Sequence, residues 1–145
     1  MAKGFAPDAL EAACRSTRAR VLYCMPRLHN PTSAVMSERR RRQIAAIAEK
    51  YRLTVIEDDV YGFLSPERAS LSALIPDRTI FVTSVSKSLF PGMRLGCAVA
   101  PPAMVEKLSA RRLDDDHLRA ADQRGPVVRL DGGWHRHAHS GMEAP

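Results

Sequence analysis

The run Leu53-Thr54-Val55-Ile56-Glu57-Asp58-Asp59 decides the fold, because four apolar or β-branched residues are followed directly by three acidic ones. A second run of the same kind, Thr79-Ile80-Phe81-Val82-Thr83, leads into Ser84-Val85-Ser86-Lys87. Short apolar runs that end in polar residues are typical of buried strands whose ends reach the surface. The pattern therefore predicts strands that carry ligand-binding groups at their ends.

Helical segments alternate with such strands along the chain. Residues 8–15 show helical spacing, and Ser37 is a good N-cap for a helix with a stripe of Ile44, Ile47, Ala48 and Tyr51. Two further strands are expected at residues 21–25 and 95–100, and a helix after the Pro101-Pro102 pair. This alternation predicts an α/β fold with a mostly parallel sheet and flanking helices.

Polar groups that follow the carboxyl ends of parallel strands mark the ligand crevice of an open α/β sheet. Three of the expected strands end in such groups, around Asn30, Asp58 and Lys87. The coincidence predicts a binding site at that edge of the sheet.

Size and composition limit the possible classes of protein. The chain has 145 residues, of which 45% are hydrophobic and 26% charged. This is enough for one modest core and too little for a complete two-domain metabolic enzyme. No apolar run reaches about 18 residues, and no signal peptide is visible, so no membrane association is expected. Three widely spaced cysteines fit neither a disulfide framework nor a zinc site, which predicts a cytoplasmic location.

The formal net charge of +6 comes in part from Arg39-Arg40-Arg41-Arg42. A basic cluster can mark a nucleic-acid surface or a solvated helix face. No aromatic residues interleave with these arginines, as a single-strand binding platform would require. We therefore expect a solvated helix face.

The character of the sequence changes after about residue 110. Residues 111–145 show no amphipathic period, and we expect a non-native or disordered tail after a folded unit at residues 1–110. His135, His137 and His139 alternate there, and we expect them to be unstructured rather than metal ligands. A permitted back-translation of residues 130–138, shifted by one base, gives Trp-Met-Glu-Asp-Gly-Thr-Ala-Thr, so a reading-frame change is our hypothesis for the tail.

Four blocks of sequence, in this order, resemble the class I/II aminotransferases of pyridoxal-phosphate fold type I. The blocks are His29-Asn30-Pro31-Thr32, Glu57-Asp58-Asp59-Val60-Tyr61, Ser84-Val85-Ser86-Lys87 and Pro91-Gly92-Met93-Arg94-Leu95-Gly96. The chain looks most like the aminotransferase-like domain of GntR/MocR-type regulators, over residues 8–110. The resemblance implies a partial large domain of the aspartate-aminotransferase fold.

The resemblance also implies pyridoxal 5'-phosphate (PLP) as cofactor and assigns roles around its ring. Lys87 would form the Schiff base and later move the substrate proton. Asp58 would pair with the pyridinium nitrogen; Asp59 competes for this role, but the family places a tyrosine three residues after the aspartate, and Tyr61 fits Asp58. Tyr61 and Asn30 would hydrogen-bond the phenolic oxygen of the cofactor.

Hydroxyl groups and a guanidinium suit a phosphate dianion. By the same resemblance, Ser84, Ser86 and Arg94 would hold the cofactor phosphate, with Ser84 the more direct match. Ser33 stands where the family usually has glycine after Asn-Pro-Thr.

Three functions follow from the resemblance. The first is an aminotransferase that, when intact, moves an amino group between an amino acid and a 2-oxo acid as a homodimer. The second is the effector-sensing domain of a GntR/MocR-type transcriptional regulator, although this chain alone shows no winged-helix segment for binding nucleic acid. The third is an inactive truncated fragment. The upstream phosphate loop and the small domain of the family are not seen in these residues, so we expect no turnover from this chain alone.

Overall fold

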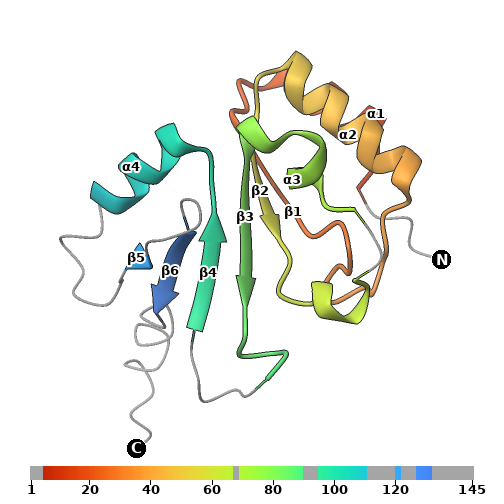
Figure 1. Ribbon diagram of the computed structural model, residues 1–145. Helices are drawn as coiled ribbons and strands as arrows, with labels where there is room; N and C mark the ends of the chain where they lie inside the picture. The colour runs from red at the N-terminus through yellow and green to blue at the C-terminus, as the bar shows by residue number, and fades with distance from the viewer. Residues whose placement is uncertain (1–4, 67–68, 90–94, 111–119, 122–126, 132–145) are drawn as a thin grey trace, which may run out of the picture.

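The computed structural model describes residues 5–66, 69–89, 95–110, 120–121 and 127–131 (Figure 1). The helices are α1 (Pro7–Ser16), α2 (Glu38–Lys50), α3 (Leu71–Leu74) and α4 (Pro102–Ala110), with the 3-10 turns η1 (Gly62–Leu64) and η2 (Pro76–Arg78). The strands are β1 (Val21–Cys24), β2 (Thr54–Asp58), β3 (Thr79–Ser84), β4 (Leu95–Val99), β5 (Ala120–Ala121) and β6 (Val127–Asp131). Each strand and helix expected within residues 1–110 is present, with bounds that differ by one or two residues.

The strands form one six-stranded sheet in the order β1-β2-β3-β4-β6-β5. β1, β2 and β3 pair in parallel, with Tyr23 opposite Ile56 and Ile56 opposite Ile80. β4 pairs antiparallel with β3 and with β6, and β5 pairs antiparallel with β6. The expected α/β fold with flanking helices is confirmed, and the sheet is mixed because parallel pairing stops at β3.

Helix α2 begins and ends as its sequence requires. The Ser37 hydroxyl accepts a hydrogen bond from the Arg40 backbone N–H at 3.4 Å, as expected for an N-cap. At the other end Arg52 has a φ of 53°, in the left-handed region. The Leu53 N–H donates to the Ala48 carbonyl at 2.8 Å, and the Arg52 N–H donates to the Glu49 carbonyl at 3.1 Å. These two bonds form a Schellman motif, which turns the chain from α2 directly into β2.

The hydrophobic core lies between strands β1 and β2 and the three helices α1, α2 and α3, which pack together (Figure 1). Along β1, Leu22 and Cys24 face this core, whereas Val21 and Tyr23 lie on the opposite face and are 55% and 56% exposed. The largest fully buried apolar side chains of the cluster are Ile44, Leu53, Leu71 and Val55. The helices thus cover one face of the parallel strands.

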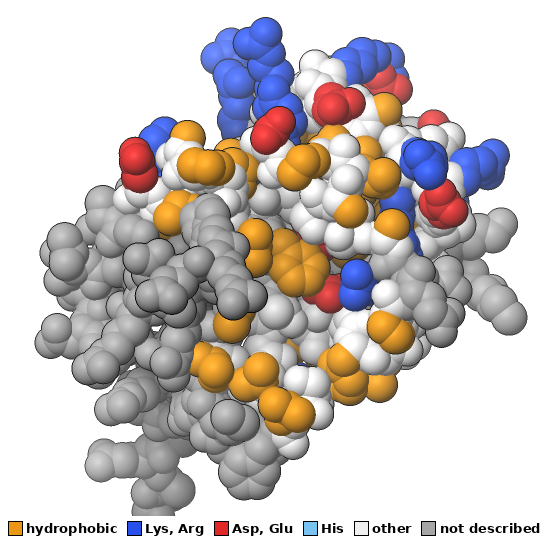
Figure 2. Space-filling model, viewed as in Figure 1, with side chains coloured by type: hydrophobic (Ala, Val, Ile, Leu, Met, Phe, Trp, Pro, Cys, Tyr) orange, Lys and Arg blue, Asp and Glu red, His pale blue; other side chains and the backbone are white. Residues whose placement is uncertain are grey.

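The arginine cluster of α2 corrects one expectation. Figure 2 shows lysine and arginine side chains gathered at the end of the molecule that carries α1 and α2. Arg41, however, is only 2% exposed, because it lies on the same side of α2 as Ile44, Ala45 and Ala48. Its guanidinium donates to the Ala69 carbonyl and, at 3.5 Å, to the Pro26 carbonyl. The solvated face expected for the whole cluster is therefore wrong for Arg41.

The described helices are short, and none of them is long and apolar enough to cross a membrane. Cys14, Cys24 and Cys97 are free thiols. Burial, and to a smaller extent the charge of Glu57, raises the pKa of the Cys24 thiol to about 12, so Cys24 behaves as a small core residue.

Strands β5 and β6 fall within residues 111–145, which the sequence predicts to be a non-native or disordered tail. β6 pairs with β4 from Leu95 opposite Asp131 to Val99 opposite Val127. The three alternating histidines lie outside the described residues. The origin of this segment therefore stays a prediction.

Candidate functional site

The polar groups singled out in the sequence lie at one edge of the sheet. Because β1, β2 and β3 are parallel, their carboxyl ends lie together, toward the lower edge of the view in Figure 1. Asp58 is the last residue of β2, Asn30 lies in the loop after β1, and Lys87 lies in the turn after β3. Tyr61 immediately precedes η1. These four residues therefore lie in the segments at or after the carboxyl ends of the three parallel strands.

The Asp58 carboxylate is held by two donors, one on each oxygen. The Tyr23 hydroxyl donates to Oδ2 at 2.6 Å, and the Val60 backbone N–H donates to Oδ1 at 3.0 Å. The parallel register explains the first contact, since Tyr23 lies opposite Ile56, and Ile56 and Asp58 share one face of β2. Partial desolvation, followed by the hydrogen bond to Asp58, raises the pKa of Tyr23 to about 12. Tyr23 is therefore a neutral donor at physiological pH.

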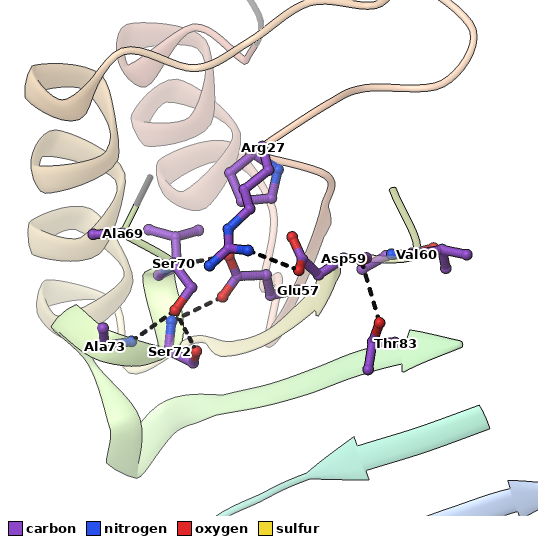
Figure 3. A network of polar contacts seen from close by, with 12 residues as sticks. Arg27, Glu57, Asp59, Val60, Ala69, Ser70, Ser72, Ala73 and Thr83 are labelled. Atoms are coloured by element: carbon purple, nitrogen blue, oxygen red, sulfur yellow. Dashed lines mark hydrogen bonds and ion pairs between the residues drawn. The ribbon is translucent and has the colours of Figure 1, made fainter. Parts of the chain in front are cut away.

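The Asp59 side chain lies on the other side of the chain, inside the protein. It is 6% exposed, and Arg27 Nη1 donates to its Oδ2 at 3.2 Å (Figure 3). Burial raises the pKa of Asp59 to about 6, although the Arg27 charge works in the opposite direction. Asp59 Oδ1 is buried, and no hydrogen-bond donor reaches it from the described residues. Of the two candidate aspartates, Asp59 is engaged internally, and this supports Asp58 as the one that meets a ligand.

Gly62 is required by the position of Asp59. A Cβ atom on Gly62 would lie 1.9 Å from Asp59 Oδ2, far inside van der Waals contact. The backbone also fixes Asp59, since its N–H donates to the Val82 carbonyl at 2.8 Å and the Thr83 hydroxyl donates to the Asp59 carbonyl at 3.3 Å. The turn that follows Asp58 is thereby attached to β3.

Glu57 is fully buried and is used structurally. Its carboxylate accepts from the backbone N–H of Leu71 at 3.0 Å and of Ser72 at 2.8 Å, at the start of α3. Figure 3 shows Glu57 beside Ser70 and Ser72 at the start of α3, and Arg27 directed at Asp59. The three acidic residues at the end of β2 thus face different ways: the side chains of Glu57 and Asp59 are buried, and that of Asp58 lies on the face of the strand that carries Tyr23.

Ser84 ends β3, and the turn that follows carries Ser86 and Lys87. The Ser84 hydroxyl donates to the Leu95 carbonyl of β4 at 3.0 Å and accepts from the Ser86 backbone N–H at 3.2 Å. The Ser84 hydroxyl would therefore have to leave the Leu95 carbonyl before it could donate to a phosphate. The side chain of Lys87 is exposed at the head of this turn. Arg94, the third expected phosphate ligand, lies outside the described residues.

Asn30 lies in a tight exposed loop. The peptide bond between Asn30 and Pro31 is cis, and the Ser33 N–H donates to the His29 carbonyl at 2.7 Å. Ser33 has a φ of 52°, in the left-handed region, where glycine is favoured over residues with a Cβ atom. The backbone thus explains why glycine suits this position.

Sequence reasoning missed Tyr23 and Arg27. Tyr23 alternates with the core residues of β1 and so had to lie on the other face, but its contact with Asp58 depends on the register between two strands. Arg27 is a basic residue just after β1, and the acidic cluster lies at the end of the neighbouring strand β2. This combination was the available signal for an ion pair. Among the described residues, no group of three or more His, Cys, Asp or Glu side chains could hold a metal ion.

The structure is similar to those of known aminotransferases. It matches an archaeal alanine:glyoxylate aminotransferase with a TM-score of 0.73 at 29% identity, over 79% of this chain and 30% of that one. It also matches LysN, the α-aminoadipate aminotransferase of Thermus thermophilus complexed with N-(5'-phosphopyridoxyl)-L-leucine, with a TM-score of 0.71 at 34% identity, over 78% and 31% of the two chains.

Curated relatives divide between regulators and enzymes. The HTH-type transcriptional regulator YdeF of Bacillus subtilis is 40% identical over 104 residues, which are 71% of this chain and 22% of YdeF. Aminotransferase swnA of Metarhizium robertsii is 36% identical over 121 residues, 72% of this chain and 24% of swnA. The chain therefore spans about a quarter of the length of these relatives. Residues 3–113 match the family described as "Aminotransferase class I and II", and the chain belongs to that family.

Proposed function

We propose that this chain carries the cofactor-binding part of an aminotransferase and that it binds PLP through Lys87. The observation that carries the proposal is the arrangement at the carboxyl edge of the parallel strands, where Asp58, held by two donors, ends β2 and the exposed Lys87 lies in the turn after β3. A fixed carboxylate suits the ring nitrogen of PLP, and an exposed amine suits its aldehyde, so the residues present fit the cofactor. When bound, PLP supplies an electron sink for negative charge at the α-carbon of an amino acid.

Each residue of the site then has a task of its own. Lys87 Nζ would hold the cofactor and would carry the proton that leaves the substrate α-carbon. Asp58 would face the ring nitrogen. Asn30 and Tyr61 would donate to the phenolic oxygen. Ser84, Ser86 and Arg94 would hold the phosphate, and the Ser84 hydroxyl already donates to the Leu95 carbonyl.

The substrates of the intact protein would be an amino acid and a 2-oxo acid, and its active site would form in a homodimer. Because the chain spans 22% of YdeF and 24% of swnA, residues outside it would complete the site. We therefore expect PLP binding, and no turnover, from this chain alone. A cytoplasmic location stays a prediction.

The test is to mix the purified chain with PLP and record the visible absorbance of the lysine-bound cofactor. We expect a band that Lys87→Ala abolishes and that the matched variant Lys107→Ala, at an exposed lysine of α4, leaves unchanged. Borohydride reduction followed by peptide mass spectrometry should place the cofactor on Lys87. Absence of the band from the native chain, or a label on another lysine, would refute the proposal.

A second candidate function is the effector-sensing domain of a transcriptional regulator, which the 40% identity to YdeF favours. In that case the same site binds PLP or an amino compound, and DNA is bound by a separate domain. The coding sequence upstream of residue 1 distinguishes the two functions, because a regulator would encode a winged-helix domain there. The reading frames of the gene beyond codon 110 also test the proposed frame change. If none of them continues the aminotransferase sequence, the frame change is refuted.

A further inference from the structure

Tyr23 is the one side chain among the described residues that donates a hydrogen bond to Asp58. The contact is short, at 2.6 Å between the hydroxyl oxygen and Oδ2, and it joins residues that are 35 positions apart in the sequence. The other carboxylate oxygen accepts from the Val60 N–H at 3.0 Å. Because each carboxylate oxygen has two lone pairs, both oxygens keep an acceptor position for a ligand.

Packing gives no reason for the hydroxyl of Tyr23. The residue lies on the face of β1 opposite the core and is 56% exposed, so phenylalanine would satisfy the strand equally well. Among the described residues, the hydroxyl contacts Asp58 alone. A hydrogen bond to one oxygen of a carboxylate limits its rotation and so fixes the direction of its remaining acceptor positions.

We propose that Tyr23 is a positioning residue of the cofactor site, whose hydroxyl fixes the orientation of the Asp58 carboxylate. A carboxylate held in this orientation would keep an acceptor position directed at the ring nitrogen of PLP. The inference rests on the proposed function for the cofactor, but the Tyr23–Asp58 contact itself can be tested without it.

The first experiment uses the full chain without PLP, labelled with ¹³C at the ζ carbon of tyrosine. The three tyrosine signals are assigned with Tyr23→Phe and with the matched variant Tyr51→Phe, whose hydroxyl contacts Glu11 at 3.3 Å on the far side of the core. In Asp58→Asn we expect the Tyr23 signal to move and its ionisation midpoint to fall, while the Tyr51 signal stays in place. An unchanged Tyr23 signal would overturn the inference. Circular dichroism at each pH confirms that the variants remain folded.

The second experiment follows the visible band of the PLP-bound chain against pH. In Tyr23→Phe the Asp58 carboxylate loses the hydrogen bond that orients it and stabilises the positive charge on the ring less well, so the ionisation midpoint of the band should rise by about half a pH unit. Tyr51→Phe should leave it unchanged. The inference would be overturned if the Tyr23 NMR signal shifts in Asp58→Asn but the ionisation midpoint of the PLP band is unaltered in Tyr23→Phe. That pair of results would show a structural contact only. If the native chain gives no band, the proposed function fails, and the NMR result still decides whether Tyr23 holds Asp58.

Discussion

Replacing Asp59 by asparagine should remove a specific pH dependence of stability. The pKa of Asp59 is raised from 3.8 to about 6, chiefly by burial. The folded protein therefore holds this proton more tightly than the unfolded chain does. Between about pH 4 and pH 6 the folded state is protonated at Asp59 and the unfolded state is not, so the free energy of unfolding falls as pH rises through this window.

The magnitude follows from the size of the shift. A change of one pKa unit corresponds to about 1.4 kcal/mol. Because the unfolded carboxyl is already partly ionised at pH 4, Asp59 lowers the stability at pH 7 by about 2.5 kcal/mol relative to pH 4. Other carboxyl groups titrate in the same range, but they are common to both proteins. Subtracting the stability of Asp59→Asn from that of the native chain isolates the contribution of Asp59.

The assay is urea unfolding, followed by circular dichroism at intervals from pH 4 to pH 7.5. We expect the difference between the native chain and Asp59→Asn to decline by about 2.5 kcal/mol across the series and then to level off. Asp77→Asn, the same chemical change at an exposed carboxyl group, is the matched control and should give a difference that is nearly constant. A constant difference for Asp59→Asn as well would refute the raised pKa and with it the cost assigned to burying this charge.

Two further predictions concern the backbone. Gly62→Ala places a Cβ atom 1.9 Å from Asp59 Oδ2, so it should displace the carboxylate from Arg27 and lower the unfolding free energy by about 3 kcal/mol. The double variant with Asp59→Ala should lose less stability than the sum of the two single variants. Additive losses would contradict this cause. Ser33→Gly and Arg52→Gly relieve positive φ angles of 52° and 53°, and each should raise the melting temperature through a gain of about 0.5–1 kcal/mol. Ala46→Gly, inside α2, should instead cost about 1 kcal/mol, and a loss at Ser33 or Arg52 would argue against relief of backbone strain.

The parts of the fold that could be predicted from sequence are those whose signal is local. The apolar runs, the Ser37 cap and the stripe of α2 each depend on residues a few positions apart, and all three are present in the structure. α3 was missed because its four residues are too few for a helical period. Arg41 was assigned to solvent because composition shows a cluster of charge, but not which member of it faces the core.

The candidate site was predictable at the level of residue types and not of contacts. The position of Asn30, Asp58 and Lys87 at one edge follows from parallel pairing, which alternation of strands and helices indicates. The choice between Asp58 and Asp59 rested on the spacing to Tyr61, and the burial of Asp59 supplies an independent reason for it. The hydroxyl of Tyr23 reaches Asp58 only because of the β1–β2 register, and no local pattern encodes that register.

The buried Glu57 carboxylate sets the order in which this part of the chain can fold. A helix of four residues cannot form by itself, because nucleation fixes several residues for one hydrogen bond. α3 exists because Glu57 accepts the N–H groups of Leu71 and Ser72, which begin the helix and have no acceptor within it. Those acceptors are in place only once β2 has joined the sheet. We infer that α3 is a late element of the folding pathway, conditional on the strand that it covers.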